Sequence, residues 1–459
     1  MPLLSRKGFT IDSPQRLIHL GFLLSFFILG SCTKNDNKVL PQLNIPKHFP
    51  AQTASYRPVK QLPYTRWWAQ FHDTKLNQYI AQGLERNLDM HIAFDNLQKA
   101  QGQLNEVELS WFPTIKTFAG YSTNPALGIP GGFYGVWPTY AINILQLFQQ
   151  QKRARYSVEY YQAMVEGTRL TVIGQIASAY ITLIAQQEQL RLLKRLEKHV
   201  AELVGFSRKD IKIGLKNEID LADIQVDKSL VDSQINIVEN NIVRSQNALR
   251  FLLNENPGRI SSKNNFSAIN FTKFKPGSLP VSVLNNRPDI KMATYAAKAA
   301  RVDVSLARSE FFPLLQLDQF IGEGHLPHNQ IANVSDAYFN WSVAPSTLGR
   351  ISSQKAAFKA SVHEYIKTVR KVLRDVDNSY SANRKLNNYY LAVKKAENEY
   401  RHQFNLQKGL LNTGLISYKQ LLENEITLDN LALSSNQAKL ELALSLVLLY
   451  QDLAGGYKA

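Results

Sequence analysis

The sequence can be read twice, with the two readings 200 residues apart. Corresponding positions include Phe112-Pro113 and Phe312-Pro313, Tyr180 and Tyr380, Gly214-Leu215 and Gly414-Leu415, and Leu249 and Leu449. This period is too long for a solenoid unit, so the chain is predicted to be one structural half duplicated, with the same elements in the same order. Duplication of this kind suits a pseudo-symmetric assembly.

The N-terminus has the features of an exported lipoprotein. Basic residues precede an apolar run over 17–29, which is too short to cross a bilayer and ends in the small residues Gly30 and Ser31. Residues 1–31 are therefore predicted to be a signal peptide. The stretch Leu29-Gly30-Ser31-Cys32 resembles the bacterial lipobox, in which the cysteine is acylated and becomes the first mature residue. Cys32 is the only cysteine, so the chain can form no internal disulfide.

The position after this cysteine indicates where the lipoprotein is delivered. Lipoproteins retained in the inner membrane usually carry Asp there, whereas this chain has Thr33. The resemblance therefore points to the outer membrane of a Gram-negative cell, with outer-membrane lipid as a partner.

The charge of the chain does not indicate a nucleic-acid surface. The net charge is +16, and about +14 remains after the signal peptide. The basic residues alternate with acidic ones along predicted helices, as in 191–198, without interleaved aromatics. Beyond the signal peptide no apolar run looks long enough for a transmembrane helix, so membrane spanning is predicted to use strands, or else the lipid alone anchors the chain.

Each half shows the same order of local signals. A helix is predicted over Leu76–Leu109, ending before Phe112-Pro113. Strands are predicted at Thr114–Thr123, Thr139–Phe148, Leu314–Ile321 and Ala337–Val343, with loops at Asn124–Pro138 and Gly322–Asp336. The last strand alternates, with Ala337, Phe339, Trp341 and Val343 on one face, as expected for a strand that faces lipid.

Two very long helical stretches follow each predicted hairpin. They cover 153–213, 217–253, 351–412 and 417–453, and the later arm of each half carries apolar residues at seven-residue spacing. This spacing predicts helices packed side by side in a coiled-coil manner. The fold class is thus mainly α with a membrane β portion. Four strands cannot close a barrel and lipid does not tolerate open edges, so the chain should oligomerise; three copies would supply about twelve strands.

The turns between the long helices carry a family resemblance. The tip sequences Ile213-Gly214-Leu215-Lys216-Asn217 and Thr413-Gly414-Leu415-Ile416-Ser417 are similar to the Val-Gly-Leu tips of the TolC/OprM family of outer-membrane efflux proteins. Further family marks are Trp67-Trp68 with Phe71 and Asp73, Arg287-Pro288-Asp289-Ile290 with Phe312-Pro313, and the closing Gly455-Gly456. The chain departs from the family at Ala454 in the terminal motif and at Gln149, where the second half has Gly349.

The resemblance implies a homotrimer whose outer-membrane barrel continues into a periplasmic helical tunnel. It implies an inner-membrane pump that supplies the energy and a periplasmic adaptor that docks on Ile213, Gly214, Leu215, Thr413, Gly414 and Leu415. A constriction is expected near these tips, with Asp220, Asp223, Glu423 and Glu425 as candidate gate residues. The predicted function is the passive exit duct of a tripartite efflux system. The alternatives are the outer channel of a type I protein secretion system and a non-conducting periplasmic scaffold lipoprotein.

No catalytic residues, metal site or cofactor are predicted. The sequence has neither a His-Glu-x-x-His pattern nor a phosphate-binding glycine loop, and the lone cysteine is at the lipid site. His325 and His328 lie in a predicted loop, where solvated histidines are the more common case. The predicted organisation is a signal peptide over 1–31, a lipid-anchored segment over 32–66, a first repeat over 67–258, a linker over 259–282, a second repeat over 283–456 and a tail over 457–459.

Overall fold

The computed structural model describes residues 40–41, 43–46, 49–51, 62–123, 131–215, 217–260, 262, 266–273, 286–323 and 331–458. The chain divides into two compact units, Met1–Gln42 and Leu43–Ala459, and every helix and strand named below belongs to the second. The predicted signal peptide, Cys32, His325 and His328 lie outside the described residues.

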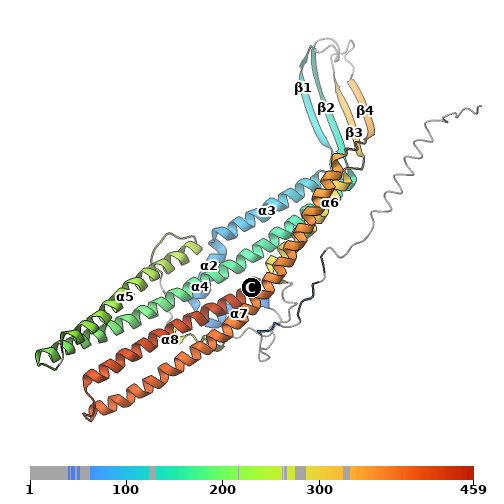
Figure 1. The fold of residues 1–459 in the computed structure, drawn as a ribbon. Helices are drawn as coiled ribbons and strands as arrows, with labels where there is room; N and C mark the ends of the chain where they lie inside the picture. Colours follow the sequence, from blue (N-terminus) through green and yellow to red (C-terminus); the bar gives the residue numbers. More distant parts are fainter. Residues whose placement is uncertain are drawn as a thin grey trace, which may run out of the picture. The chain divides into compact units, whose positions relative to one another are not determined.

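The described elements repeat in order, as the sequence predicted (Figure 1). The first half contains 3-10 helices η1 (Leu62–Tyr64) and η2 (Trp67–Phe71), helices α2 (Thr74–Arg86) and α3 (Leu88–Leu109), strands β1 (Thr114–Ser122) and β2 (Gly131–Ile142), and helices α4 (Ile144–Lys212) and α5 (Glu218–Leu252). The second contains η4 (Phe266–Ala268), η5 (Phe271–Lys273), α6 (Pro288–Ser309), β3 (Leu314–Glu323), β4 (Ile331–Asn340), α7 (Ser346–Asn412) and α8 (Tyr418–Asp452). The series α3-β1-β2-α4-α5 thus corresponds to α6-β3-β4-α7-α8.

The helix predicted over Leu76–Leu109 is interrupted at Asn87. The backbone of Asn87 is extended, and its side-chain oxygen accepts hydrogen bonds from the amides of Asp89 (2.9 Å) and Met90 (3.3 Å). Its side-chain amide donates to the Leu252 carbonyl at 2.9 Å. The prediction of one helix was therefore wrong, because Asn87 caps α3 and joins it to the end of α5.

The boundaries of β2 and α4 also differ from the predictions. β2 begins at Gly131, within the predicted loop Asn124–Pro138, and ends at Ile142. Asn143 accepts a hydrogen bond from the Gln146 amide at 3.0 Å and so starts α4 at Ile144. The predicted strand over Thr139–Phe148 was therefore too long at its end, and Gln149, where a family glycine is missing, lies inside α4.

The second half repeats these corrections. β3 extends to Glu323, and β4 begins at Ile331, within the predicted loop Gly322–Asp336. β4 ends at Asn340 rather than at the predicted Val343, and α7 already begins at Ser346 instead of 351.

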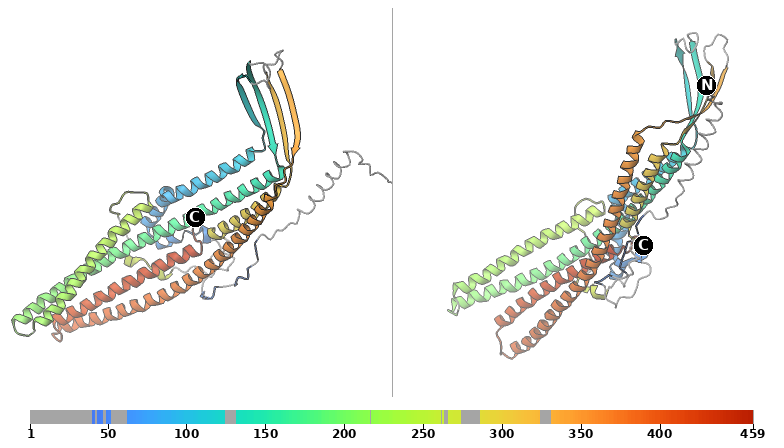
Figure 2. Two further views of the ribbon diagram at one scale, coloured as in Figure 1. Left: turned by 45° about the horizontal axis from the view of Figure 1, so that its top comes forward. Right: turned by 45° about the vertical axis from the view of Figure 1, so that its right-hand side comes forward.

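The four strands form one antiparallel sheet in the order β1-β2-β3-β4. Thr114 lies opposite Thr139, Ile142 opposite Leu315, and Leu314 opposite Asn340. The central β2–β3 pair therefore joins the two halves of the repeat (Figure 2).

The core forms where the ends of several helices surround α4. The Trp67 ring stacks on Tyr450, with the ring centres 5.0 Å apart, and the Tyr180 hydroxyl donates to Asp73 at 2.7 Å. Gly456 has a φ of +85°, and a Cβ at this position would lie 2.6 Å from the Trp68 ring. The residues near both ends of the chain that carry the family resemblance thus pack on one another and stabilise the fold.

Helix α4 is more apolar than predicted, because no apolar run beyond the signal peptide was expected to be long enough to cross a membrane. An 18-residue window of α4 has a mean hydropathy of 1.3 and is long and apolar enough to cross a membrane. However, 61% of that window is buried inside the protein, which is the pattern of a core helix. The seven-residue row predicted in the second half is confirmed as a packing surface, since Leu421, Leu428, Leu442 and Leu449 are all buried. In the row predicted in the first half only Leu249 is buried, and Leu221, Ile235 and Ile242 are half-buried.

Candidate functional site

The sheet has two chemically different faces. The registers place one set of side chains on what we term the apolar face, with Ile115, Val136, Leu317, Ile321 and Phe339 among its members. The opposite, polar face carries Lys116, Gln316, Asp318, Asp336 and Asn340. This division is typical of membrane strands that have lipid on one side and water on the other.

Glycines in the sheet leave room for aromatic rings on its polar face. The Phe118 ring stacks on Phe320 with the centres 5.5 Å apart, and a Cβ at Gly135 would lie 2.8 Å from Phe118. A Cβ at Gly322 would lie 2.5 Å from the Tyr134 carbonyl oxygen. These glycines read as loop residues in the sequence, but the strands approach too closely here for larger side chains.

The sheet is open at both sides. Within the described residues β1 pairs only with β2, and β4 only with β3. Both edges therefore present backbone groups that require another strand in a membrane.

The helices form two rows, and each row ends in an edge helix on both sides, just as the sheet ends in an edge strand on both sides (Figures 1 and 2). Next to the sheet, neighbouring helices contact one another in the order α3-α4-α6-α7, and towards the tips the order is α5-α4-α8-α7. One side of the protomer thus ends in β1, α3 and α5, and the other ends in β4 and α7.

The two predicted tips have the same backbone geometry. Gly214 and Gly414 have φ values of +76° and +73°, in the left-handed region that favours glycine. The amide of Leu215 donates to the Asp210 carbonyl at 2.9 Å, and that of Leu415 to the Leu410 carbonyl at 3.0 Å. Each helix therefore ends in a Schellman motif. Ile213, Leu215 and Leu415 are about 70% exposed, at 69%, 73% and 73%, and Thr413 is also exposed.

The candidate gate residues do not form one cluster. Asp220 accepts from the Asn217 amide in a capping box at the start of α5, while Asp223 and Glu423 are exposed. Glu425 is half-buried on α8 and approaches His199 Nε2 at 3.8 Å. Because α4 lies between α5 and α8 in the row, Asp220 and Asp223 are separated from Glu423 and Glu425.

The sequence analysis missed an ion cluster between α4 and α8. Asp429 is almost completely buried and accepts from Arg195 Nη2 at 2.5 Å, and its other oxygen lies 2.7 Å from His199 Nδ1. Asp429 and Asn436 continue the buried seven-residue row that starts at Leu422. A carboxylate and an amide in such a row were the available signal, because buried polar groups need partners.

Further contacts join the two tip regions within the protomer. Lys419 Nζ lies 2.5 Å from Asp210, and the Tyr418 hydroxyl donates to Glu202 at 3.0 Å. Both contacts join the start of α8 to the last turns of α4, so the tips are held together by charge as well as by apolar packing.

Lys439 is a buried cation in the middle of α8. Its ammonium group donates to the carbonyls of Phe266 (2.8 Å) and Ser267 (2.9 Å) and lies 5.1 Å from the centre of the Phe266 ring. Burial lowers the pKa of Lys439 to about 8. Nearby, burial opposes ionisation of Glu397, but hydrogen bonds from Lys394 and Arg401 hold the pKa of this carboxyl below its usual value.

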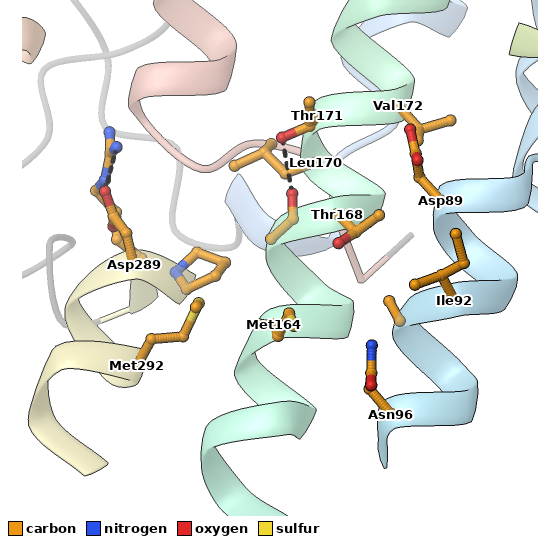
Figure 3. A pocket seen from close by; sticks show the side chains of 14 residues that line it. Asp89, Ile92, Asn96, Met164, Thr168, Leu170, Thr171, Val172, Asp289 and Met292 are labelled. Carbon is orange, nitrogen blue, oxygen red and sulfur yellow. Dashed lines mark hydrogen bonds and ion pairs between the residues drawn. The ribbon is translucent and has the colours of Figure 1, made fainter. Parts of the chain in front are cut away.

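A cavity of about 530 Å³ lies among α3, α4 and α6 (Figure 3). Asp89 and Asp289, which correspond in the repeat, flank it near the starts of α3 and α6, and Ile92, Met164 and Met292 also line it. This lining does not pair a nucleophile with a base. In the part of the chain that the structure describes, no group of three or more His, Cys, Asp or Glu side chains could hold a metal ion.

The model of the family described as "Outer membrane efflux protein" matches this chain twice, over residues 79–255 and 279–455. The two matches cover most of the chain and are themselves 200 residues apart. The chain belongs to the outer membrane efflux protein family. This family is one of channel proteins rather than of enzymes, and its location is the outer membrane.

Individual relatives agree with this assignment to the outer membrane efflux protein family. The chain is 23% identical to the probable efflux pump outer membrane protein TtgC of Pseudomonas putida, with 95% of each sequence covered. It is 22% identical to the probable outer membrane lipoprotein SilC of Salmonella typhimurium, over 88% of this chain and 91% of SilC. The open-state structure of the Neisseria gonorrhoeae MtrE outer membrane channel has the same fold, with a TM-score of 0.79 at 20% identity, covering 91% of this chain and 97% of MtrE.

Proposed function

We propose that this outer membrane efflux protein is the passive exit duct of a tripartite efflux system and that it works as a homotrimer. The observation that carries the proposal is the open sheet, which has an apolar face, a polar face and an unpaired strand at each side. Open strand edges are not stable in lipid, so further copies must complete the sheet. Three copies give about twelve strands, an even number within the range of bacterial barrels.

The helical rows support the same assembly. Each row ends in α7 on one side and in α3 or α5 on the other. Repetition of such a unit around an axis produces a closed ring with head-to-tail contacts. With two repeats in each copy, a ring of three has pseudo-sixfold regularity, which fits a tube.

The system around the duct is inferred from the relatives and from the tips. TtgC is named as a protein of an efflux pump, and such a pump in the inner membrane would supply the energy. A periplasmic adaptor would dock on Ile213, Gly214, Leu215, Thr413, Gly414 and Leu415. The exposed leucines offer apolar contacts, and the Schellman motifs hold them in fixed positions.

Lipidation at Cys32 is part of the proposal. Its support is the lipobox-like sequence, together with the naming of SilC as a probable outer membrane lipoprotein. The proposed layout follows the predicted one, with a signal peptide over 1–31 and a lipid-anchored segment over 32–66.

The test is conduction by the purified protein in a planar bilayer, with the mass of the detergent-solubilised assembly measured by light scattering. We expect a trimer with discrete, ohmic current steps. A trimer without conductance would favour the scaffold alternative, and a monomer in mild detergent would contradict the proposal as a whole.

A type I protein secretion channel would also conduct, so a second measurement distinguishes the two functions. Deletion of the gene should raise the cellular accumulation of small pump substrates while leaving the secreted proteins unchanged. The reverse result would favour protein secretion.

A further inference from the structure

We propose that a basic pocket between α4, α7 and α8 binds a small oxyanion, a molecule that carries phosphate or carboxylate groups. The pocket has a volume of about 240 Å³, and the 3-10 helix η4 also contributes to its lining. None of the described lining residues belongs to the tips or to the sheet. The inference therefore goes beyond the proposed exit duct and does not depend on what the duct carries.

Positive charge dominates the lining of the basic pocket. Five cations converge from three helices: Arg191 and Arg195 from α4, Lys394 and Arg401 from α7, and Lys439 from α8. Among the described residues only two acidic ones, both glutamates, line the pocket, so the formal net charge of the lining is +3. Such an excess of one sign of charge in a small volume attracts anions.

The four outer cations have carboxylate partners but keep unused N–H donors. Their contacts are Arg191–Glu188 at 2.7 Å, Arg195–Asp429 at 2.5 Å, Lys394–Glu397 at 2.7 Å and Arg401–Glu397 at 2.8 Å. Arginine has five N–H donors and lysine has three, so these contacts within the described residues use only part of them. Guanidinium groups bind phosphate and carboxylate through paired N–H donors. The cations can therefore accept further oxygen atoms as partners.

Lys439 is the one buried cation in the described lining, with 7% of its surface exposed. Among the described residues its ammonium group contacts the carbonyls of Phe266 and Ser267 and two aromatic rings, and no carboxylate. The two carbonyls take two of its three N–H donors, which leaves one for a ligand. A buried cation without an anionic partner destabilises a fold, and a bound anion would remove this cost.

The internal repeat shows which charge is missing. In the first half, Lys194 of α4 contacts Glu239 of α5 at 3.0 Å. At the offset of 200 residues, the corresponding pair in the second half is Lys394 of α7 and Lys439 of α8. Burial and the charge of Lys394 lower the pKa of Lys439 to about 8, which is the effect of two ammonium groups that repel each other. A lysine thus replaces the carboxylate of the first half, and a bound oxyanion would supply the negative charge.

The size of the basic pocket favours a small ion. Its volume lies below the range of about 300–1,000 Å³ that is usual for sites of drug-sized molecules. On the α8 side the lining includes Ala432 and Ser435, whose short side chains leave room for a ligand above the helix. An oxyanion in this place would contact cations of α4 from the first repeat and of α7 and α8 from the second, so its binding should stabilise the contact between the two halves.

The test is calorimetric titration of the purified, detergent-solubilised full-length protein at pH 7. Sodium phosphate and sodium citrate are the probes, and sodium chloride at equal ionic strength is the reference. We expect saturable binding of one oxyanion per protomer and no saturable binding of chloride. Tighter binding of phosphate than of citrate would identify a phosphate ligand, and the reverse order a carboxylate ligand.

Substitutions locate the binding site. Lys439→Met removes the buried cation, and Lys439→Glu gives Lys394 the carboxylate partner that Lys194 has in the first half. Each should weaken binding of the better probe about tenfold or more, because a hydrogen bond to a charged group is lost. Arg191→Gln should weaken it several-fold without disturbing the core, since this side chain is 56% exposed. The matched control is Lys194→Gln, which removes the corresponding lysine of the first half and should leave the affinity unchanged.

Two results would overturn the proposal. One is the same heat of titration for phosphate, citrate and chloride at equal ionic strength, which shows that no oxyanion site exists. The other is wild-type affinity in both Lys439→Met and Arg191→Gln, which places the binding elsewhere. If Lys439→Met does not fold, Arg191→Gln alone decides between these outcomes.

Discussion

At the residue scale, substitutions of the tip glycines should affect docking of the adaptor without affecting folding. Nothing lies within 4 Å of a Cβ built at Gly214 or Gly414, so a side chain there meets only the cost of the left-handed backbone, about 1 kcal/mol at each site. Leucine at both positions should leave the trimer intact, because its core lies elsewhere. It should also reduce chemical cross-linking to the cognate adaptor several-fold, because the larger side chains alter the proposed docking surface.

Two other glycines provide the control for this experiment. Gly205 in α4 and Gly409 in α7 are exposed, and they too have open space where a side chain would lie, but their backbones are helical. Leucine at both should leave adaptor cross-linking at the wild-type level. Unchanged cross-linking in the Gly214/Gly414 double variant as well would exclude the tips as the docking site.

Lys439 gives a prediction for the pH dependence of stability. Its pKa is about 8 in the folded chain, whereas an unfolded lysine has a pKa of about 10.4. Between these values the unfolded chain binds more protons, so the contribution of Lys439 to the free energy of unfolding rises with pH. Below about pH 8 both states are protonated, and the contribution is constant at its least favourable value.

The measurement compares unfolding midpoints of wild type and Lys439→Met from pH 7 to pH 10. Wild type should gain stability relative to the variant above pH 8, and the difference should be flat below it. The exposed Lys198→Met serves as the control. A pH-independent difference between wild type and Lys439→Met across the range would rule out a depressed pKa.

At the element scale, the sequence predicted which elements exist better than where they end. The long helices were confirmed to within one residue at the tips, where Gly214 and Gly414 stop them. The start of β2 was misplaced because Gly131, Gly132 and Gly135 look like loop residues, and only the positions of the neighbouring strands show why glycine is needed at Gly135. The cap at Asn87 was not predicted for the same reason, because its hydrogen-bond partner, the carbonyl of Leu252, is 165 residues away in the sequence.

The candidate site shows the same limit. The tip residues lie where the sequence predicted them, because a turn between two helices is a local feature. The cluster of Arg195, His199 and Asp429 depends on α4 packing against α8, a contact between residues more than 200 positions apart. The seven-residue row marks Asp429 as a buried carboxylate, but it does not show which side chains pair with it.

At the scale of the whole molecule, the strands and the proposed lipid make separate contributions to membrane attachment. Replacing Cys32 by Ala, with a signal peptide that needs no lipidation, should still give trimers in the outer membrane, because the apolar face of the sheet has its own affinity for lipid. Mass spectrometry of the wild-type protein should show an acylated N-terminal Cys32. An intact mature peptide spanning Ser31 and Cys32 would exclude lipidation.

α4 and α7 have 69 and 67 residues and run without interruption from the sheet to the tips, a length of about 100 Å each. The helices that pack against them are shorter: α3 and α6 contact them in the half next to the sheet, and α5 and α8 contact them in the half towards the tips. α4 and α7 are therefore the two continuous rods of the protomer. A mechanical load applied by a partner at the tips must pass along these rods to the sheet, so the tips can dilate only by bending or twisting two long helices and not by turning on a loop hinge.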